Sequence, residues 1–171
     1  YGNGISLNRV GLYSYQDTLL ANTGSLFVTD SYIEGATDYI WGYAASYFQR
    51  CELKANANSA YYSQARNSQA SRGFSFVNCT LDAYAGVTNS SATLSRTFGT
   101  AAPFSQTAYV NCRMGQQIQP TGWKINDTTN TNATVQLWEY QSRDLSNNLL
   151  DVSQRPTFNR SFSVSGTNIV Y

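Results

Sequence analysis

The chain has 171 residues, a length typical of one domain, and its 11 basic residues nearly balance its 10 acidic residues. Charged residues make up only 12% of the chain, so the composition gives no reason to expect nucleic acid or an anionic membrane as a partner. Histidine is absent, which excludes Ser-His-Asp and Cys-His nucleophiles and most zinc sites. Any catalysis must therefore use carboxylates, arginine, amides or tyrosine.

A short phrase recurs along the chain and ends at an anchor residue, in order Val10, Ser31, Cys51, Cys79 and Cys112. An apolar residue stands three positions before each anchor, at Leu7, Val28, Phe48, Phe76 and Tyr109. Another stands two positions after it, at Leu12, Ile33, Leu53, Leu81 and Met114. The residue directly before the anchor is polar, at Arg9, Asp30, Arg50, Asn78 and Asn111.

The anchors lie 21, 20, 28 and 33 residues apart, a spacing typical of a solenoid that adds one coil per repeat. The phrases are rich in strand-forming residues, and no long amphipathic helical pattern occurs. The sequence therefore predicts an all-β fold, a single right-handed parallel β-helix over residues 1–171. A β-sandwich is the alternative, but it gives no reason for the same column to recur. The cysteine column should be a buried stack, in which one disulfide is geometrically possible.

Two aspartates occupy equivalent places on the first two coils. Asp17 lies seven residues after Val10, and Asp38 lies seven residues after Ser31. Adjacent strands of such a stack are about 4.8 Å apart, and two carboxylates at that separation resist being ionised together. One carboxyl acid and one carboxylate side by side could serve as acid and nucleophile. The alternative is a pair of solvated turn residues.

Several stretches of the chain resemble motifs of the pectin methylesterases (pectinesterases), and they occur in the order of that family. "YQDTL" resembles the Gln-Asp-Thr-Leu motif, and "GATDYIWG" resembles Gly-x-x-Asp-Phe-Ile-Phe-Gly. Weaker similarities follow, in "YYSQARN", "LSRTF", "PTGW" and "LWEY". The resemblance covers roughly residues 1–140 and implies hydrolysis of the methyl esters of pectin without a metal or organic cofactor.

The resemblance also implies roles for individual residues. Asp38 would be the nucleophile that attacks the ester carbonyl carbon, and Asp17 would protonate the departing methoxide. Gln16 would donate a hydrogen bond to the developing oxyanion, and Arg96 would pair with Asp38 and keep it ionised. Substrate-binding residues are expected at Phe98, Trp123 and Gln64, whereas Tyr39 and Trp41 are expected to pack beneath the site.

The chain departs from the family in two respects. In "LSRTF" the Gly, Pro and Trp of the family are replaced by Ser95, Thr97 and Phe98, which alters the expected substrate wall. The family also carries a Gly-rich motif and a second oxyanion Gln upstream of Gln16. We therefore expect either a β-helix domain that lacks its N-terminal coils or an incomplete oxyanion hole.

Composition and resemblance together predict the cellular setting and the competing functions. Asn-x-Ser/Thr sequons, the acceptor sites of N-glycosylation, indicate a secreted glycoprotein of the cell wall. The alternative is chance, because a chain rich in Asn, Ser and Thr readily produces such sequons. They lie at Asn78, Asn89, Asn126, Asn132 and Asn159. A catalytically impaired polysaccharide-binding β-helix is the alternative function. A lyase or polygalacturonase would need a calcium-binding acidic cluster or a triple-Asp site with His, and neither is visible.

Overall fold

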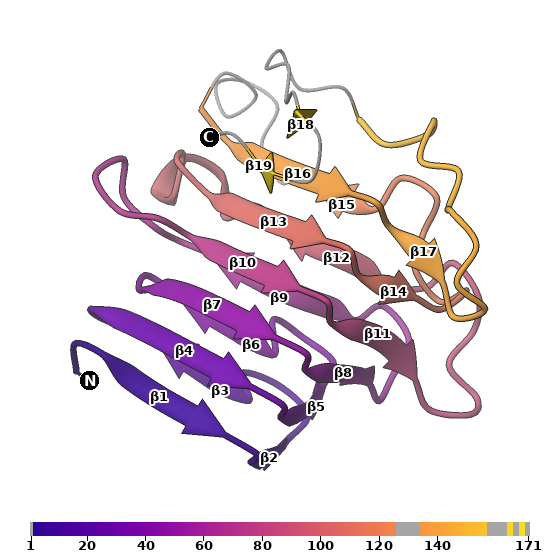
Figure 1. Cartoon of the computed structure of the whole chain (residues 1–171), viewed down its shortest axis with the longest axis horizontal. Helices are drawn as coiled ribbons and strands as arrows, with labels where there is room; N and C mark the ends of the chain where they lie inside the picture. The colour runs from indigo at the N-terminus through magenta and orange to yellow at the C-terminus, as the bar shows by residue number, and fades with distance from the viewer. Residues whose placement is uncertain (1, 126–133, 157–163, 166–167, 170–171) are drawn as a thin grey trace.

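The computed structural model describes residues 2–125, 134–156, 164–165 and 168–169. Its strands stack in coils along one axis (Figure 1), and the predicted parallel β-helix is confirmed. Within the described part of the chain the helical segment is one short 3-10 turn, Gly99–Ala101. No helix among these residues is long and apolar enough to cross a membrane.

Three parallel sheets form the walls of the solenoid. The first sheet contains β1 (Ile5–Asn8), β4 (Ser25–Thr29), β7 (Ala45–Gln49), β10 (Phe74–Val77), β13 (Gln106–Val110) and β16 (Gln136–Tyr140). The second contains β2 (Gly11–Tyr13), β5 (Tyr32–Gly35), β8 (Glu52–Ala55), β11 (Thr80–Ala83), β14 (Arg113–Met114) and β17 (Arg143–Asp144). The third contains β3 (Leu19–Ala21), β6 (Ile40–Gly42), β9 (Tyr61–Ala65), β12 (Thr93–Arg96) and β15 (Trp123–Lys124). A separate antiparallel pair joins β18 (Val164–Ser165) to β19 (Asn168–Ile169).

The predicted columns are confirmed by the strand register. In the first sheet Leu7, Val28, Phe48, Phe76 and Tyr109 are successive partners. In the second sheet the same holds for Leu12, Ile33, Leu53, Leu81 and Met114. The structure adds a sixth coil, in which Ser142 takes the anchor place and Glu139 pairs with Tyr109. The sequence pattern missed this coil because a charged residue stands there where the other coils have an apolar one.

The polar column before the anchors forms the corner between the first and second sheets. Its residues all adopt a left-handed backbone, with φ of 55° at Arg9, 51° at Asp30, 52° at Arg50, 54° at Asn78 and 54° at Asn111. This conformation turns the chain within two residues, and Asn and Asp are the non-glycine residues that adopt it most readily. The column is therefore polar both because it faces solvent and because the corner requires this backbone.

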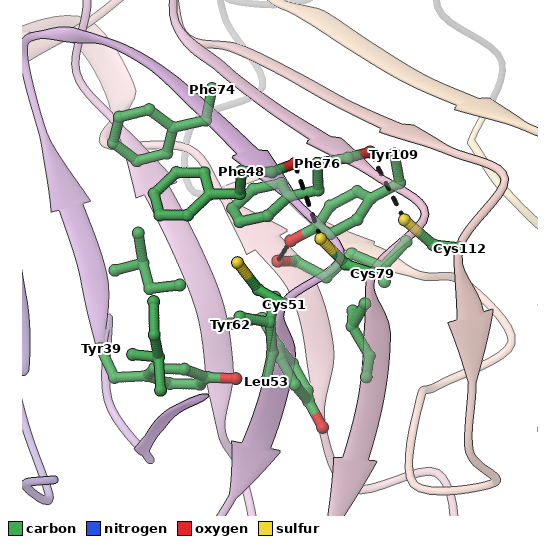
Figure 2. Packing of buried hydrophobic residues seen from close by; sticks show 14 of the residues in the cluster. Tyr39, Phe48, Cys51, Leu53, Tyr62, Phe74, Phe76, Cys79, Tyr109 and Cys112 are labelled. Carbon is green, nitrogen blue, oxygen red and sulfur yellow. Dashed lines mark hydrogen bonds between the residues drawn. The ribbon is translucent and has the colours of Figure 1, made fainter. Parts of the chain in front are cut away.

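Aromatic rings stack along the axis of the core (Figure 2). Phe76 lies between Phe48 and Tyr109, with ring centroids 4.6 Å away on each side and interplanar angles of 15° and 8°. All three side chains are fully buried. The Tyr109 hydroxyl donates to the carbonyl of Leu94 at 2.8 Å, so the one polar group of the stack is satisfied.

Replacing Phe76 with alanine is expected to lower the free energy of unfolding by about 3–5 kcal/mol, because it leaves a cavity between two rings. Urea denaturation measures this loss. Phe27→Ala is the control, since Phe27 also stacks on a ring, Tyr47 at 5.5 Å, but is 41% exposed on the outer face of the first sheet. Equal losses in the two variants would contradict the central role of the buried stack.

The three cysteines lie in one buried column next to the aromatic stack, as predicted (Figure 2). All three are free thiols, so the geometrically possible disulfide is not formed. Each thiol faces a backbone carbonyl of the preceding coil, and the Cys79 thiol donates to Phe48 at 3.6 Å. A hydrogen bond with the Cys112 thiol, aided by burial, raises the pKa of Cys79 to about 12. A hydrogen bond with Cys79 and burial likewise raise the pKa of Cys51.

Stability is expected to fall as the pH rises above about 8.5, the pKa of a thiol in an unfolded chain. Above that pH the unfolded chain loses protons that the folded Cys79 keeps until about pH 12. This thiol therefore contributes its full stabilisation below pH 8.5 and loses about 1.4 kcal/mol per pH unit above it. Urea unfolding at pH 8 and pH 10 tests this. Cys79→Ser should show a weaker dependence, and a parent protein equally stable at both pH values would refute the expectation.

Candidate active site

Two turns that lead into adjacent strands of the third sheet carry Asp17 and Asp38. Gln16 and Thr37 pair as a parallel bridge, and the Asp17 N–H donates to the carbonyl of Thr37 at 3.2 Å. Both aspartates have a left-handed backbone, with φ of 54° and 47°. The register therefore places them at equivalent positions on consecutive coils, as their spacing from the anchors predicts.

Asp38 is buried, with only 3% of the residue exposed, and its carboxylate is held by Arg96. Nε of Arg96 donates to Oδ1 at 2.7 Å, and Nη2 donates to Oδ2. Burial of a carboxylate is costly unless a cation and hydrogen bonds compensate for it, and a bidentate arginine supplies both. The hydrogen bonds to Asp38 in turn raise the pKa of Arg96 above its usual value.

Arg96 reaches Asp38 across an intervening strand. It ends β12, whereas Asp38 precedes β6, and β9 lies between these two strands in the third sheet. The side chain crosses β9 above Tyr61, whose ring centroid lies 4.5 Å from the guanidinium carbon. Tyr61 therefore supports the cation from below through its π face.

Asp17 and Gln16 differ from Asp38 in their surroundings, because both are exposed on the first coil. Two neighbouring carboxyl groups, one buried on an arginine and one in water, can take different roles in one reaction. The exposed amide of Gln16 can turn to face a bound group. The structure thus gathers Asp38, Arg96, Asp17 and Gln16 at one corner of the third sheet.

Lys124 is a further cation at this site, and none of the sequence motifs indicated it. It lies beside Arg96 in the strand register, and its Nζ donates to the Tyr61 hydroxyl at 3.1 Å. Tyr61 was missed as well. The spacing of seven residues from the anchor residue locates Asp17 and Asp38 but no site residue on later coils. The longer loop between β8 and β9 shifts the equivalent positions there.

Phe98 and Trp41 enclose the guanidinium of Arg66. Its central carbon lies 3.8 Å from the Phe98 ring centroid and 4.3 Å from that of Trp41. Nε of Arg66 also donates to Oε1 of Gln64 at 2.7 Å. Phe98 is 39% exposed, so it lies at the surface where a substrate wall was expected.

Two predicted positions differ in the structure. Gln64 is fully buried beneath Arg66 rather than lining a groove. Trp41, expected beneath the site, lies partly exposed on the outer face, because Ile40 takes the inward position of β6. Tyr39 is fully buried, as expected.

Trp123 also differs from its predicted role as a wall for sugar rings. It is 6% exposed, and its ring packs 5.8 Å from that of Tyr109 in the core. In β15 it pairs with Ser95, on the inward side, while Lys124 takes the outward side. Strand alternation therefore turns Trp123 away from the face that carries Arg96.

Arg155 fixes the segment that leads into β15. It forms an ion pair with Glu139 at 2.6 Å and donates to the carbonyls of Gln119 and Pro120. Both partners of the ion pair are largely buried. The "PTGW" and "LWEY" stretches therefore meet through Arg155 and support the core beneath the site, which gives them a structural role.

Within the described ranges no three or more His, Cys, Asp or Glu side chains lie grouped so that they could hold a metal ion. The groups assembled at the corner are carboxylates, guanidinium groups, an amine, a phenol and an amide. Such groups can perform nucleophilic attack, proton transfer and stabilisation of an oxyanion.

The chain is similar to one family over most of its length. The family model described as Pectinesterase matches residues 3–164. Pectinesterase QRT1 of Arabidopsis thaliana is 33% identical over 138 residues, which are 79% of this chain and 34% of that protein. Pectinesterase 2 of Olea europaea is 32% identical over 146 residues, 83% of this chain and 37% of that protein.

Solved structures agree with this similarity. The pectin methylesterase from Aspergillus niger superposes with a TM-score of 0.74 at 25% identity, covering 91% of this chain and 50% of that one. The pectin methylesterase from carrot shares the fold with a TM-score of 0.74 at 22% identity, over 86% of this chain and 48% of that one. The chain thus spans about a third of the length of the curated relatives and about half of the solved chains. The expected lack of N-terminal coils stays a prediction.

Proposed function

We propose, because this chain belongs to the pectinesterase family, that it carries the reacting groups of an enzyme that removes methyl esters from pectin. The observation that carries the proposal is the buried Asp38 carboxylate, held by both nitrogens of an Arg96 fork beside the exposed Asp17. A charge fixed in this way is oriented before substrate arrives, so little reorganisation is needed during the reaction.

In the first half of the proposed reaction Asp38 attacks the carbonyl carbon of the methyl ester. A bond forms between its carboxylate oxygen and that carbon, and the carbonyl electron pair moves onto oxygen. The amide of Gln16 donates to this oxyanion. When the oxyanion collapses, the bond to the methoxy oxygen breaks, Asp17 gives it a proton, and methanol leaves a covalent acyl-enzyme.

In the second half a water molecule attacks the acyl carbon. Asp17, now a carboxylate, takes the proton of that water, and the bond to Asp38 breaks. The products are a free galacturonate carboxyl group and the original state of both aspartates. Arg96 retains its charge throughout and stabilises the Asp38 carboxylate as it leaves.

The proposed place of action is the cell wall, outside the cell, where methyl-esterified pectin is found. Two of the predicted glycosylation acceptors, Asn78 and Asn89, are exposed in the structure and could be modified during secretion. Asn126, Asn132 and Asn159 lie outside the described residues.

A second candidate is a polysaccharide-binding protein without esterase activity. It is favoured by the replacement of the family's Trp with Phe98, whose ring contacts Arg66 at 3.8 Å. The reacting carboxylates alone do not separate the two candidates, since a binding protein could retain them.

Methanol release from esterified pectin by the purified protein at its natural length is the test. The proposed esterase should release methanol and new carboxyl groups in equal amounts, with no unsaturated and no new reducing ends. Binding of pectin without methanol release would favour the second candidate. Unsaturated or reducing ends would instead indicate cleavage of the polymer backbone and would refute both.

A further inference from the structure

Two cations of the third sheet reach back over a neighbouring strand in the same way. Arg96 of β12 crosses β9 to reach Asp38. Lys124 of β15 crosses β12 to reach Tyr61 at the start of β9. Lys124 is the register partner of Arg96, so the two side chains leave adjacent strands and run in the same direction. The second crossing therefore ends at the ring above which Arg96 lies.

The Tyr61 side chain contacts both cations. The guanidinium carbon of Arg96 lies 4.5 Å from the ring centroid. Nζ of Lys124 lies 5.5 Å from the same centroid and 3.1 Å from the hydroxyl oxygen. The backbone carbonyl of Tyr61 accepts from the N–H of Tyr39, the residue after Asp38, at 3.4 Å. The backbone of Tyr61 is thus tied to the coil of Asp38, and Lys124 holds the tip of its ring.

Lys124 uses its amine on this ring rather than on a carboxylate. It is exposed, and it forms no ion pair in the part of the chain that the structure describes. Its one hydrogen-bond partner among those residues is the Tyr61 hydroxyl. The other lysine of the chain, Lys54, instead pairs with Asp82 at 2.7 Å. The contact of Lys124 therefore bears on the support of Arg96.

The orientation of the Asp38 carboxylate depends on Arg96. The Arg96 side chain is long and 26% exposed, and it spans a whole strand before it meets the carboxylate. An aromatic face beneath a guanidinium attracts it and restricts its movement out of its plane. A small misplacement of a reacting group lowers the rate strongly. A group that fixes the Tyr61 ring therefore also affects attack by Asp38.

We propose that Lys124 is a positioning residue, which fixes the Tyr61 ring beneath Arg96 and thereby holds the Asp38 carboxylate ready to attack the ester. This inference rests on the proposed function for the reaction itself. Lys124 acts through Tyr61 and Arg96 and not through contact with substrate. Its loss should therefore lower kcat and leave KM almost unchanged.

Three changes at Lys124 and Tyr61 test the proposal on methyl-esterified oligogalacturonate. Tyr61→Leu removes the ring and should lower kcat about tenfold, with KM changed less than about twofold. Tyr61→Phe keeps the ring without its hydroxyl and should lose about threefold, and Lys124→Met should lose the same. The variant with both Tyr61→Phe and Lys124→Met should also lose only about threefold, because Lys124 acts through the hydroxyl.

Tyr84→Leu is the matched control. Tyr84 directly follows β11 of the second sheet, is 46% exposed and lies beneath a cation, since Nζ of Lys54 is 5.7 Å from its ring centroid. Its replacement removes an equivalent ring away from the Asp38–Arg96 pair. Both kcat and KM should be unchanged in this variant.

Hydrogen exchange of the Arg96 Nε–H, followed by NMR, gives a readout that needs no catalysis. This proton is donated to Oδ1 of Asp38 at 2.7 Å, and its signal is identified by its absence from Arg96→Gln. Exchange should be about tenfold faster in Tyr61→Leu and about threefold faster in Lys124→Met. It should be unchanged in Tyr84→Leu.

The outcomes separate this inference from the proposed function. Faster exchange in the Tyr61 and Lys124 variants of a parent that releases no methanol would support the positioning and refute the esterase. In an active parent, unchanged kcat and exchange in Lys124→Met would overturn the role of Lys124. Losses that multiply in the double variant would also overturn it, since Lys124 would then act independently of Tyr61. A loss confined to KM would do the same, because it would place Lys124 on the substrate.

Discussion

Asp38→Asn is expected to abolish methanol release from esterified pectin, with a loss of at least about 10⁴-fold in kcat. The amide is nearly the same size and tolerates the left-handed backbone, with φ of 47°, but it is a poor nucleophile. The chain has no histidine, and Asp17 already serves as the acid and base of the proposed reaction, so no second nucleophile remains to replace Asp38. Methanol release is measured together with the melting temperature.

Asp30→Asn is the matched control. Asp30 lies on the same coil, has φ of 51° and pairs with both nitrogens of Arg50 at 2.7 Å. It differs in being exposed at the opposite corner, between the first and second sheets. Activity should be unchanged in this variant. Near-parental turnover by folded Asp38→Asn would show that Asp38 is a structural turn residue and would remove the centre of the proposed mechanism.

Arg96→Gln is expected to destabilise the fold by about 3 kcal/mol and to lower kcat by about 100-fold. The Asp38 side chain is 5% exposed, and removing its cation leaves a buried charge without compensation. The estimate is at the low end for a buried pair, because the Arg96 side chain is 26% exposed and its loss admits water. For a chain of this length the melting temperature should fall by roughly 6–12 °C.

A double-mutant cycle separates the ion pair from other effects of the substitution. The variant with both Asp38→Asn and Arg96→Gln should be more stable than Arg96→Gln alone, because it contains no unpaired buried charge. Losses that simply add would show that the two side chains do not interact energetically. Arg50→Gln, which breaks the exposed pair with Asp30, should leave the melting temperature almost unchanged.

The repeat could be predicted from the sequence because each corner between the first and second sheets contains two residues. β4 ends at Thr29 and β5 begins at Tyr32, and the same spacing recurs between β7 and β8. A fixed corner keeps apolar residues at constant offsets on both sides of the anchor. The columns around Cys51 are therefore visible without any knowledge of three-dimensional structure.

The corner that leads into the third sheet has no such regularity. Four residues, 36–39, separate β5 from β6, whereas five residues, 56–60, separate β8 from β9 and nine, 84–92, separate β11 from β12. Counting residues from the anchors therefore aligns Asp17 with Asp38 on the first two coils. On later coils the same count no longer identifies equivalent positions. The position of Arg96 rested on the resemblance, and the contacts of Tyr61 and Lys124 required coordinates.

The prediction of which aromatic side chains of the third sheet face solvent was wrong for a related reason. Short strands such as β6 and β15 contain too few residues to show an alternation of apolar and polar side chains. Aromatic residues occur on both faces, with Trp41 outside and Trp123 inside. Composition alone could not tell which ring meets solvent.

The span of the Asp38–Arg96 pair bears on how cooperatively the solenoid unfolds. In a stack of coils the stability is close to a sum of terms within each coil and between neighbours, so the ends can unravel one coil at a time. This pair instead joins the second coil to the fourth and encloses the third, where Tyr61 lies. Opening of any one of the three coils disrupts the contact, which couples them into a single unit of local unfolding. Amide hydrogen exchange should accordingly be slow and uniform from β4 to β12 and faster at both ends, and the Asp38 carboxylate should lie inside the block that opens last.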